Sequence, residues 1–274
     1  MRPLTLQAAY YQQFDADLSL PVPGEGYGGW QQAPLTLDLD HTAVVVMHAW
    51  ATGTPEQFPG WYRAVEYIPR SQQIITAILP GLLQTVRTAG IKLFHVVDGG
   101  DYYRRYPGYA RAVALAGPEP PLPTVPVDPT LAALRTFRGR HVFVGAHNQP
   151  DVDAGFRQLD FPLEAVPLGD EGVAENAHQL TALCLDAGVK HLIYAGFAIN
   201  WCLLMSPGGM VDMRRRGVLC STFRQAVTAV ENKESARTEA HKAEALWRVA
   251  LAFGFVFDLD EFIEKVQADE SRLG

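Results

Sequence analysis

A cysteine stands just past the end of a strand that the sequence predicts, which is a position suited to a nucleophile. The apolar run 190–195 predicts a buried strand, and the segment Gly196-Phe-Ala-Ile-Asn-Trp-Cys202 follows it directly. Unpaired N–H groups at the start of a helix after this turn would stabilise the Cys202 thiolate. They could also hold an oxyanion during acyl transfer. The alternative is a buried structural cysteine, because free Cys is among the most buried residue types.

The strand before this cysteine is one of several that the sequence predicts. Short apolar runs alternate with helical windows, and these runs are residues 43–47, 93–97, 142–145, 191–195, 218–222 and 255–257. Helical spacing connects Ile74 with Val86, and Pro80 should kink or restart that helix. Another helix should end at Gly188, and a late one should cover residues 243–253. This alternation is typical of a parallel sheet with helices on both faces.

Polar side chains follow several of these strands. In a parallel sheet, ligands bind at the carboxyl ends of the strands. The residues at those positions include His48, Asp98, His147 and Cys202. We therefore expect a cleft that brings together a thiol, two imidazoles and a carboxylate. Arg104, in a tyrosine-rich run, could clamp a substrate carboxylate, or it could be a solvated loop residue or a subunit contact.

Length and composition predict one sizeable core. The chain has 274 residues, of which 48% are hydrophobic and 19% are charged. We predict an N-terminal arm or edge extension over residues 1–40, which show no clear periodicity, and one domain over residues 41–274. The proline-rich segment 117–129 is expected to be a surface crossover inside that domain, with a linker as the alternative.

Charge and cysteine content exclude several classes of partner. The net charge of −7, without a basic stripe, argues against a nucleic-acid surface. No run is long enough to span a bilayer, and no segment looks like a signal peptide, so we expect no membrane partner. Cys184, Cys202 and Cys220 fit no disulfide framework, so we expect reduced thiols and a cytoplasmic location. The expected partner is a small-molecule substrate.

The segment around Cys202 resembles the isochorismatase-like cysteine hydrolases. The similarity consists of a strand, then Gly-x-Ala-x-Asn-x-Cys, then Arg215-Arg-Gly217 and another strand, and it extends over about residues 42–262. It implies an α/β fold, a three-layer α/β/α sandwich with a mostly parallel, Rossmann-like sheet. Members include amidases such as nicotinamidase, carbamoyl-amide hydrolases and isochorismatase, and oligomers are common among them, so we expect a homo-oligomer. We expect substrate contacts from Ala198, Ile199, Asn200 and Trp201.

The two residues that assist the cysteine in this family differ here. His48 occupies the position of the family's aspartate, and its imidazole could take the thiol proton and give it to a leaving amine. Alternatively, His48 bonds the backbone and only shapes the pocket. The family's lysine should fall within residues 167–172, which are acidic here. Lys233 is the one lysine at the correct edge, and a solvated loop residue is its simpler interpretation. Pro207 should restart the helix near residue 208, which weakens the expected thiolate stabilisation.

We predict neither a metal nor another cofactor. The nicotinamidase-like branch has an Asp-x-His-x-x-His cluster after its second strand, whereas no histidine follows Asp98 in the matching region here. The pair Asp98 and Asp101 is a poor zinc site, because zinc favours nitrogen and sulfur ligands. His95 lies within a predicted strand and is expected to be a hydrogen-bonded core residue.

Two hypotheses of different class follow. The first is an isochorismatase-like hydrolase that attacks a small-molecule amide or related C–N bond with Cys202, assisted by His48. The second is a catalytically impaired relative that acts as a small-ligand-binding or regulatory protein, because both residues that assist the cysteine are replaced. Hydrolysis of a vinyl ether is a lesser option.

Overall fold

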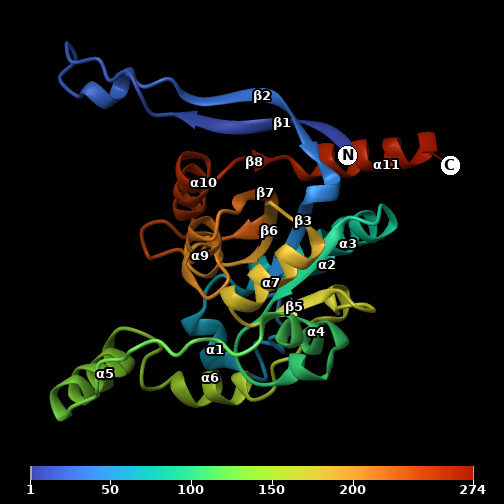
Figure 1. Ribbon diagram of the computed structural model, residues 1–274. Helices are drawn as coiled ribbons and strands as arrows, with labels where there is room; N and C mark the ends of the chain where they lie inside the picture. The colour runs from blue at the N-terminus through green and yellow to red at the C-terminus, as the bar shows by residue number, and fades with distance from the viewer. Residues whose placement is uncertain (1, 274) are drawn as a thin grey trace.

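A single sheet of eight strands runs through the part of the chain that the structure describes, residues 2–273 (Figure 1). The structure is a computed structural model, and it describes the side chains of residues 2–269. The strand order is β2-β1-β8-β7-β6-β3-β4-β5. The strands are β1 (Pro3–Gln12), β2 (Gly29–Asp38), β3 (Thr42–Met47), β4 (Lys92–Val96), β5 (Gly172–Ala174), β6 (His191–Phe197), β7 (Leu219–Thr228) and β8 (Val256–Phe257). Strands β3 to β8 pair in parallel, which confirms the predicted fold class.

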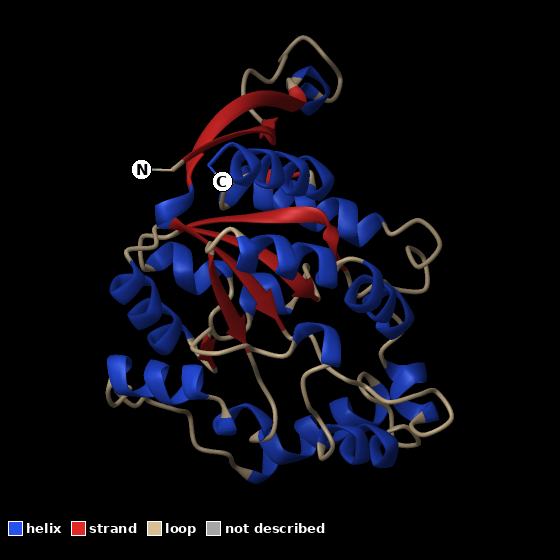
Figure 2. Ribbon diagram, turned by 90° about the vertical axis from the view of Figure 1, so that its right-hand side faces the viewer, coloured by secondary structure: helices blue, strands red, loops and turns tan. Residues whose placement is uncertain are grey.

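Helices cover both faces of this sheet, as the turned view in Figure 2 shows. One face carries α4 (Pro107–Ala116), α7 (Ala177–Ala187), α9 (Met210–Arg215) and α10 (Ala240–Ala252), and the other carries α2 (Ile68–Ala77), α3 (Leu79–Thr88) and α11 (Leu259–Leu273). Successive strand residues alternate between the two layers. Val45 and Met47 pack with α7 and α9, whereas Val44 and Val46 pack with α3 and α11. Burial on both faces explains why the central strands are apolar throughout.

The sequence signals for helix boundaries are confirmed. Pro80 is the second residue of α3, and the helix is interrupted at Ile78, between α2 and α3. Proline lacks the N–H that a helix interior needs, but it is tolerated in a first turn. Helix α7 ends before Gly188, whose φ of 68° lies in the left-handed region that favours glycine.

One predicted strand is absent, and the short strand beside β4 was not predicted. Residues 142–145 do not form a strand, because α5 (Pro129–His141) carries them away from the sheet and leaves them no strand to pair with. Phe143 in this run is 59% exposed. The strand beside β4 is instead β5, which has only three residues. A strand this short gives too few positions for a periodic pattern to appear.

Residues 3–38 form a hairpin that extends one edge of the sheet. Strand β1 pairs with β2 and also with β8, where Ala8 lies opposite Phe257. Leu4 and Leu6 are buried, while Thr5 is exposed. This period-two alternation is a strand signal that the sequence carries, although no strand was predicted there.

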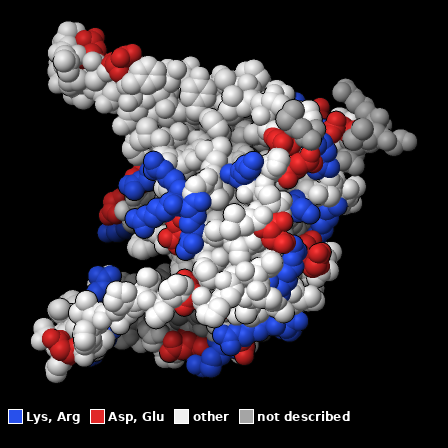
Figure 3. Space-filling model, viewed as in Figure 1, with Lys and Arg blue, Asp and Glu red and all other residues white. Residues whose placement is uncertain are grey.

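The tip of the hairpin and α5 project on the same side of the molecule, with a hollow between them (Figures 1 and 3). No residue of α5 is buried, although its side chains include Leu134 and Phe137. The proline-rich residues 117–128 that lead to α5 are likewise exposed. Residues 117–141 therefore contribute little to the core, and the chain rejoins the sheet only at β5.

The strand order reverses between β3 and β6. From β3 the chain proceeds outward through β4 and β5, whereas β6, β7 and β8 follow on the other side. A reversal of this kind leaves a crevice at the carboxyl ends of the two central strands, which is the usual ligand site of open α/β sheets. His48 directly follows β3, and the loop to Cys202 follows β6. The fold therefore delivers both residues to this crevice.

We predict that Gly196→Ala destabilises the fold by roughly 2–4 kcal/mol. Gly196 has a φ of 119°, and an added Cβ would lie 2.0 Å from the carbonyl oxygen of Met47 on β3. Gly139→Ala is the matched control, because no atom lies within 4 Å of a Cβ added there on α5. Urea unfolding followed by circular dichroism measures both. Equal midpoints for Gly196→Ala and the parent protein would contradict the close approach of the strands.

Candidate active site

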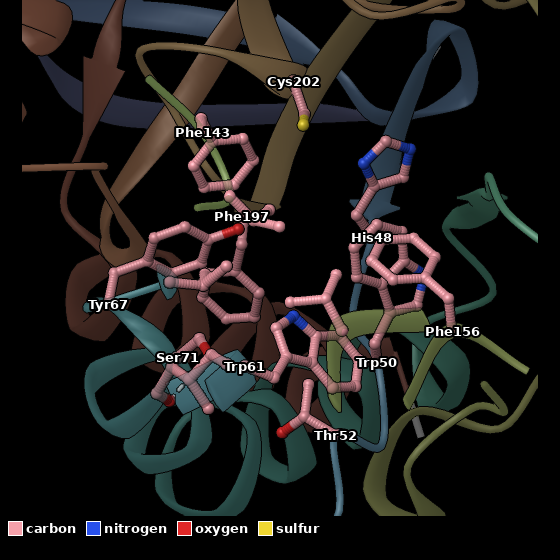
Figure 4. A pocket seen from close by; sticks show the side chains of 14 residues that line it. His48, Trp50, Thr52, Trp61, Tyr67, Ser71, Phe143, Phe156, Phe197 and Cys202 are labelled. Carbon is pink, nitrogen blue, oxygen red and sulfur yellow. Dashed lines mark hydrogen bonds between the residues drawn. The ribbon is translucent and has the colours of Figure 1, made fainter. Parts of the chain in front are cut away.

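A cavity of about 220 Å³ lies at this crevice, and both Cys202 and His48 line it (Figure 4). The other lining residues are mostly aromatic or aliphatic: Trp50, Thr52, Trp61, Val65, Tyr67, Ile68, Ser71, Phe143, Val144, Val152, Phe156 and Phe197. The structure thus brings together the two residues that the sequence suggests as a catalytic pair.

Cys202 is the first residue of α8 (Cys202–Met205), which is a single helical turn. The residue is half-buried, and its sulfur points into the cavity (Figure 4). The turn before it is held by the carbonyl of Ala198, which accepts hydrogen bonds of 3.1 Å from the N–H groups of Trp201 and Leu203. Among the described residues, the backbone N–H of Cys202 has no hydrogen-bond partner. It is therefore free to donate to a ligand.

The predicted interruption after Cys202 is confirmed. Ser206 has φ −71° and ψ 162°, the extended geometry that a following proline favours, and it ends α8. The chain becomes helical again in α9 at Met210. A one-turn helix aligns few peptide dipoles, so its field at Cys202 is weaker than that of a long helix.

His48 is a buried imidazole without hydrogen bonds. Its side chain is 4% exposed, and it stacks on Trp50 with ring centroids 4.8 Å apart and planes 12° apart. Neither ring nitrogen has a partner among the described residues. Burial lowers the pKa of His48 to about 4, although the charge of Asp98 acts in the opposite direction. The ring is therefore neutral at pH 7, and both of its nitrogens are unpaired.

Tyr67 contributes a hydroxyl to the same cavity. Burial raises the pKa of this phenol well above its usual range, and the nearby Cys202 raises it further. The hydrogen bonds of the described residues include none to the Tyr67 hydroxyl. It therefore stays protonated and can donate a hydrogen bond to a bound molecule.

Other residues that the sequence suggested as substrate contacts lie outside the cavity lining. Asp98, Arg104 and His147 are exposed. The side chain of Asn200 exchanges hydrogen bonds with the backbone of Val230. Ala198 and Ile199 are buried, and Trp201 is exposed. None of these residues lines the cavity, so the site proposed below leaves them out.

The aromatic wall of the cavity was not predicted from the sequence. Trp50, Trp61 and Tyr67 come from one connection between β3 and α2, and Phe156 comes from α6 (Gln149–Phe156). The density of aromatic residues within 50–67 was a usable signal. Phe143 had no such signal, because it reaches the cavity only through the return from α5.

The strand end at which the family's lysine was expected lies a few residues later than predicted. Strand β5 ends at Ala174, so the residue at its carboxyl end is Glu175 and not a member of 167–172. Burial alone would raise the pKa of Glu175, but hydrogen bonds from Tyr103, Tyr109 and Gln179 lower it. Lys233 is exposed, and no lysine among the described residues lines the cavity.

The predicted core role of His95 is confirmed. Its side chain is buried, and Nε2 lies 3.0 Å from a carboxylate oxygen of Glu171. Among residues 2–269, whose side chains the structure describes, no three His, Cys, Asp or Glu gather as a metal ion would require. In the same range, no helix is both long and apolar enough to cross a membrane.

Comparison with known proteins gives similarity at the level of the fold. The sequence matches no protein-family model, and no curated protein matches it. Solved structures that match most of the chain include isochorismatase family proteins, the family that the sequence resembles. A cysteine hydrolase from Pseudomonas syringae pv. phaseolicola is 15% identical, with a TM-score of 0.47 over 85% of this chain and 95% of its own.

Two further structures have similar values. N-carbamoylsarcosine amidase from Thermoplasma acidophilum is 15% identical, with a TM-score of 0.40 over 80% of this chain and 97% of its own. An octameric hydrolase of unknown specificity from Escherichia coli is 15% identical, with a TM-score of 0.40 over 86% of this chain and 84% of its own. This similarity concerns the fold alone, and we take no residue role from it.

We predict that His48→Gln makes the free energy of unfolding depend less on pH in mild acid. The unfolded chain binds a proton on this histidine near the ordinary histidine pKa of 6.5, whereas the folded protein does so only near 4. Between these values the unfolded state holds more protons, so the free energy of unfolding falls as the pH falls, by at most about 1.4 kcal/mol per pH unit. Urea titrations from about pH 7 to about pH 4.5 measure the slope.

Part of the slope should remain in the variant, because burial also lowers the pKa of His191 to about 4. Identical slopes for the parent protein and His48→Gln would show that His48 is not buried as a neutral ring.

Proposed function

We propose that this protein hydrolyses the C–N bond of a small-molecule amide, with Cys202 as nucleophile and His48 as general base and acid. The observation that carries the proposal is the shared cavity. A half-buried thiol and a buried imidazole with two unpaired nitrogens line one hollow at the reversal point of the sheet. A thiol activated by an adjacent base is the usual arrangement for covalent acyl transfer.

The first half of the proposed reaction forms a thioester. The Cys202 sulfur attacks the carbonyl carbon while its proton passes to a ring nitrogen of His48. The C–N bond then breaks, His48 gives the proton to the leaving amine, and the acyl group stays on the sulfur. The low pKa of His48 favours this return of the proton. The free N–H of Cys202 supports the negative charge on the carbonyl oxygen.

The second half regenerates the thiol. A water molecule takes the place of the amine, and His48 accepts one of its protons as the oxygen attacks the thioester carbonyl. The C–S bond breaks, the sulfur regains its proton from His48, and a carboxylic acid leaves. The same imidazole serves both halves because it begins and ends each one neutral.

A second candidate function is ligand binding without turnover, which the surroundings of His48 favour. No carboxylate among the described residues accepts a hydrogen bond from its ring, so the ring lacks the partner that orients a catalytic histidine and stabilises its charged form in a catalytic triad. Ligand-dependent thermal stabilisation without product would support this function. Steady product release that Cys202→Ala abolishes would eliminate it.

We predict that Cys202→Ser abolishes both the acyl adduct and product release. Wild-type protein incubated with a panel of small amides should gain the mass of the acyl group, measured on the intact chain. Cys184→Ser is the matched control, because that thiol is buried away from the cavity and burial raises its pKa to about 12. An adduct that persists in Cys202→Ser, or identical behaviour of wild type and variant across the panel, would count against the proposal.

We predict that His48→Ala lowers the rate of thioester formation by roughly 10²–10⁴-fold, the usual contribution of a positioned acid-base group. Single-turnover kinetics on an amide that labels Cys202 measures this rate. His141→Ala, an exposed histidine at the end of α5, should match wild type. A rate unchanged in His48→Ala would leave the thiol without its proposed base.

A further inference from the structure

Most polar side chains that line the cavity are already satisfied by the protein. The hydroxyl of Thr52 accepts from Gln72 at 2.9 Å, and that of Ser71 donates to the carbonyl of Ile68 at 2.9 Å. The indole N–H of Trp50 donates to Tyr102 at 3.0 Å. These three groups have little capacity left for a ligand.

The remaining polar groups converge on the side of the cavity near the thiol. They are the imidazole of His48, whose two nitrogens are unpaired, the hydroxyl of Tyr67 and the sulfur of Cys202. In Figure 4 the sulfur, the hydroxyl and one of the two ring nitrogens point toward the hollow. A buried imidazole with two free nitrogens is unusual, because buried polar groups are nearly always paired. This set suits one small polar group, such as a carboxamide, with its carbonyl oxygen and its N–H.

The rest of the cavity is apolar and uncharged. Among the described residues, no Lys, Arg, Asp or Glu lines it, while Trp61, Phe156 and Ile68 do. A charged group taken from water into such surroundings loses its hydration without gaining a partner, which costs several kcal/mol. The volume of about 220 Å³ corresponds to about seven water molecules at roughly 30 Å³ each, which suits one substituted ring.

We infer that the substrate is an uncharged carboxamide whose acyl group is a single apolar ring. The ring lies against Trp61 and Phe156, and the carboxamide lies between Cys202, His48 and Tyr67. Tyr67 donates its hydrogen bond to the carbonyl oxygen. This inference rests on the function proposed above for its reaction, but the ligand class itself can be tested by binding alone.

The first test measures binding to the Cys202→Ser variant, which prevents turnover. Benzamide, para-carboxybenzamide and para-aminomethylbenzamide share the carboxamide and the ring and differ in charge. Calorimetric titration should show benzamide binding at least about tenfold more tightly than either charged analogue. Equal or tighter binding of a charged analogue would overturn the inference, and so would failure of benzamide to bind at millimolar concentration.

A charge placed at the cavity rim should reverse this preference. Phe143 lines the cavity and is 59% exposed, so Phe143→Arg in the Cys202→Ser background should fold. The ratio of its affinity for para-carboxybenzamide to its affinity for benzamide should be higher than in Cys202→Ser alone. Phe137→Arg is the matched control, because Phe137 is 60% exposed on α5 and does not line the cavity. A preference that stays the same in Phe143→Arg would place the ring elsewhere.

Tyr67→Phe tests the hydrogen bond to the carbonyl. In the same background, benzamide should bind roughly threefold to tenfold more weakly, whereas ethylbenzene, which has no carbonyl, should bind as before. Equal losses for both ligands would indicate a change of cavity shape and would contradict the assigned role of Tyr67.

The two proposals fail in different ways. If benzamide binds to Cys202→Ser but gives neither an adduct nor benzoate with wild type, the proposed hydrolysis is contradicted and the inferred ligand class stands. If charged amides form adducts and benzamide does not, the proposed hydrolysis stands and the inferred ligand class is contradicted.

Discussion

The parallel pairing of β3 with β6 is the constraint on which the candidate site depends. Its register runs from Thr42 opposite His191 to Met47 opposite Gly196, so the two strands end at the same level. Gly196 permits this contact, because any side chain there would meet the Met47 carbonyl. The strand order reverses at this pair, so the residues that follow the two strands face a common crevice.

Exclusion of water governs the chemistry of that crevice. Glu171, which is also largely removed from water, is paired with other side chains. Burial would raise the pKa of Glu171, but hydrogen bonds from His95 and Arg87 lower it to about 2. His48 has no such partner, so burial lowers its pKa to about 4. An unpaired buried imidazole that shares a cavity with a thiol costs stability, but it suits a site that a ligand completes.

Much of the fold could be predicted from sequence because its central elements are buried on both faces. Such strands are continuous apolar runs, and β3, β4 and β6 lie where those runs predicted them. The elements that were missed carry a weaker signal. Strand β5 has three residues, and residues 142–145 are apolar but have no strand to pair with. Whether an apolar run becomes a strand is decided by what lies beside it.

By itself, the sequence determined the α/β class and the placement of Cys202 and His48 after the ends of two strands, because local patterning sets where each strand ends. The pairing of those two strands came from the structure. Only the tertiary structure decided what surrounds Cys202 and His48. Trp61, Phe156 and Phe143 come from separate segments that share no local pattern, and they meet only through the packing of connections outside the sheet. The same packing removes water from His48, so the charge state of its ring is a property of the folded molecule.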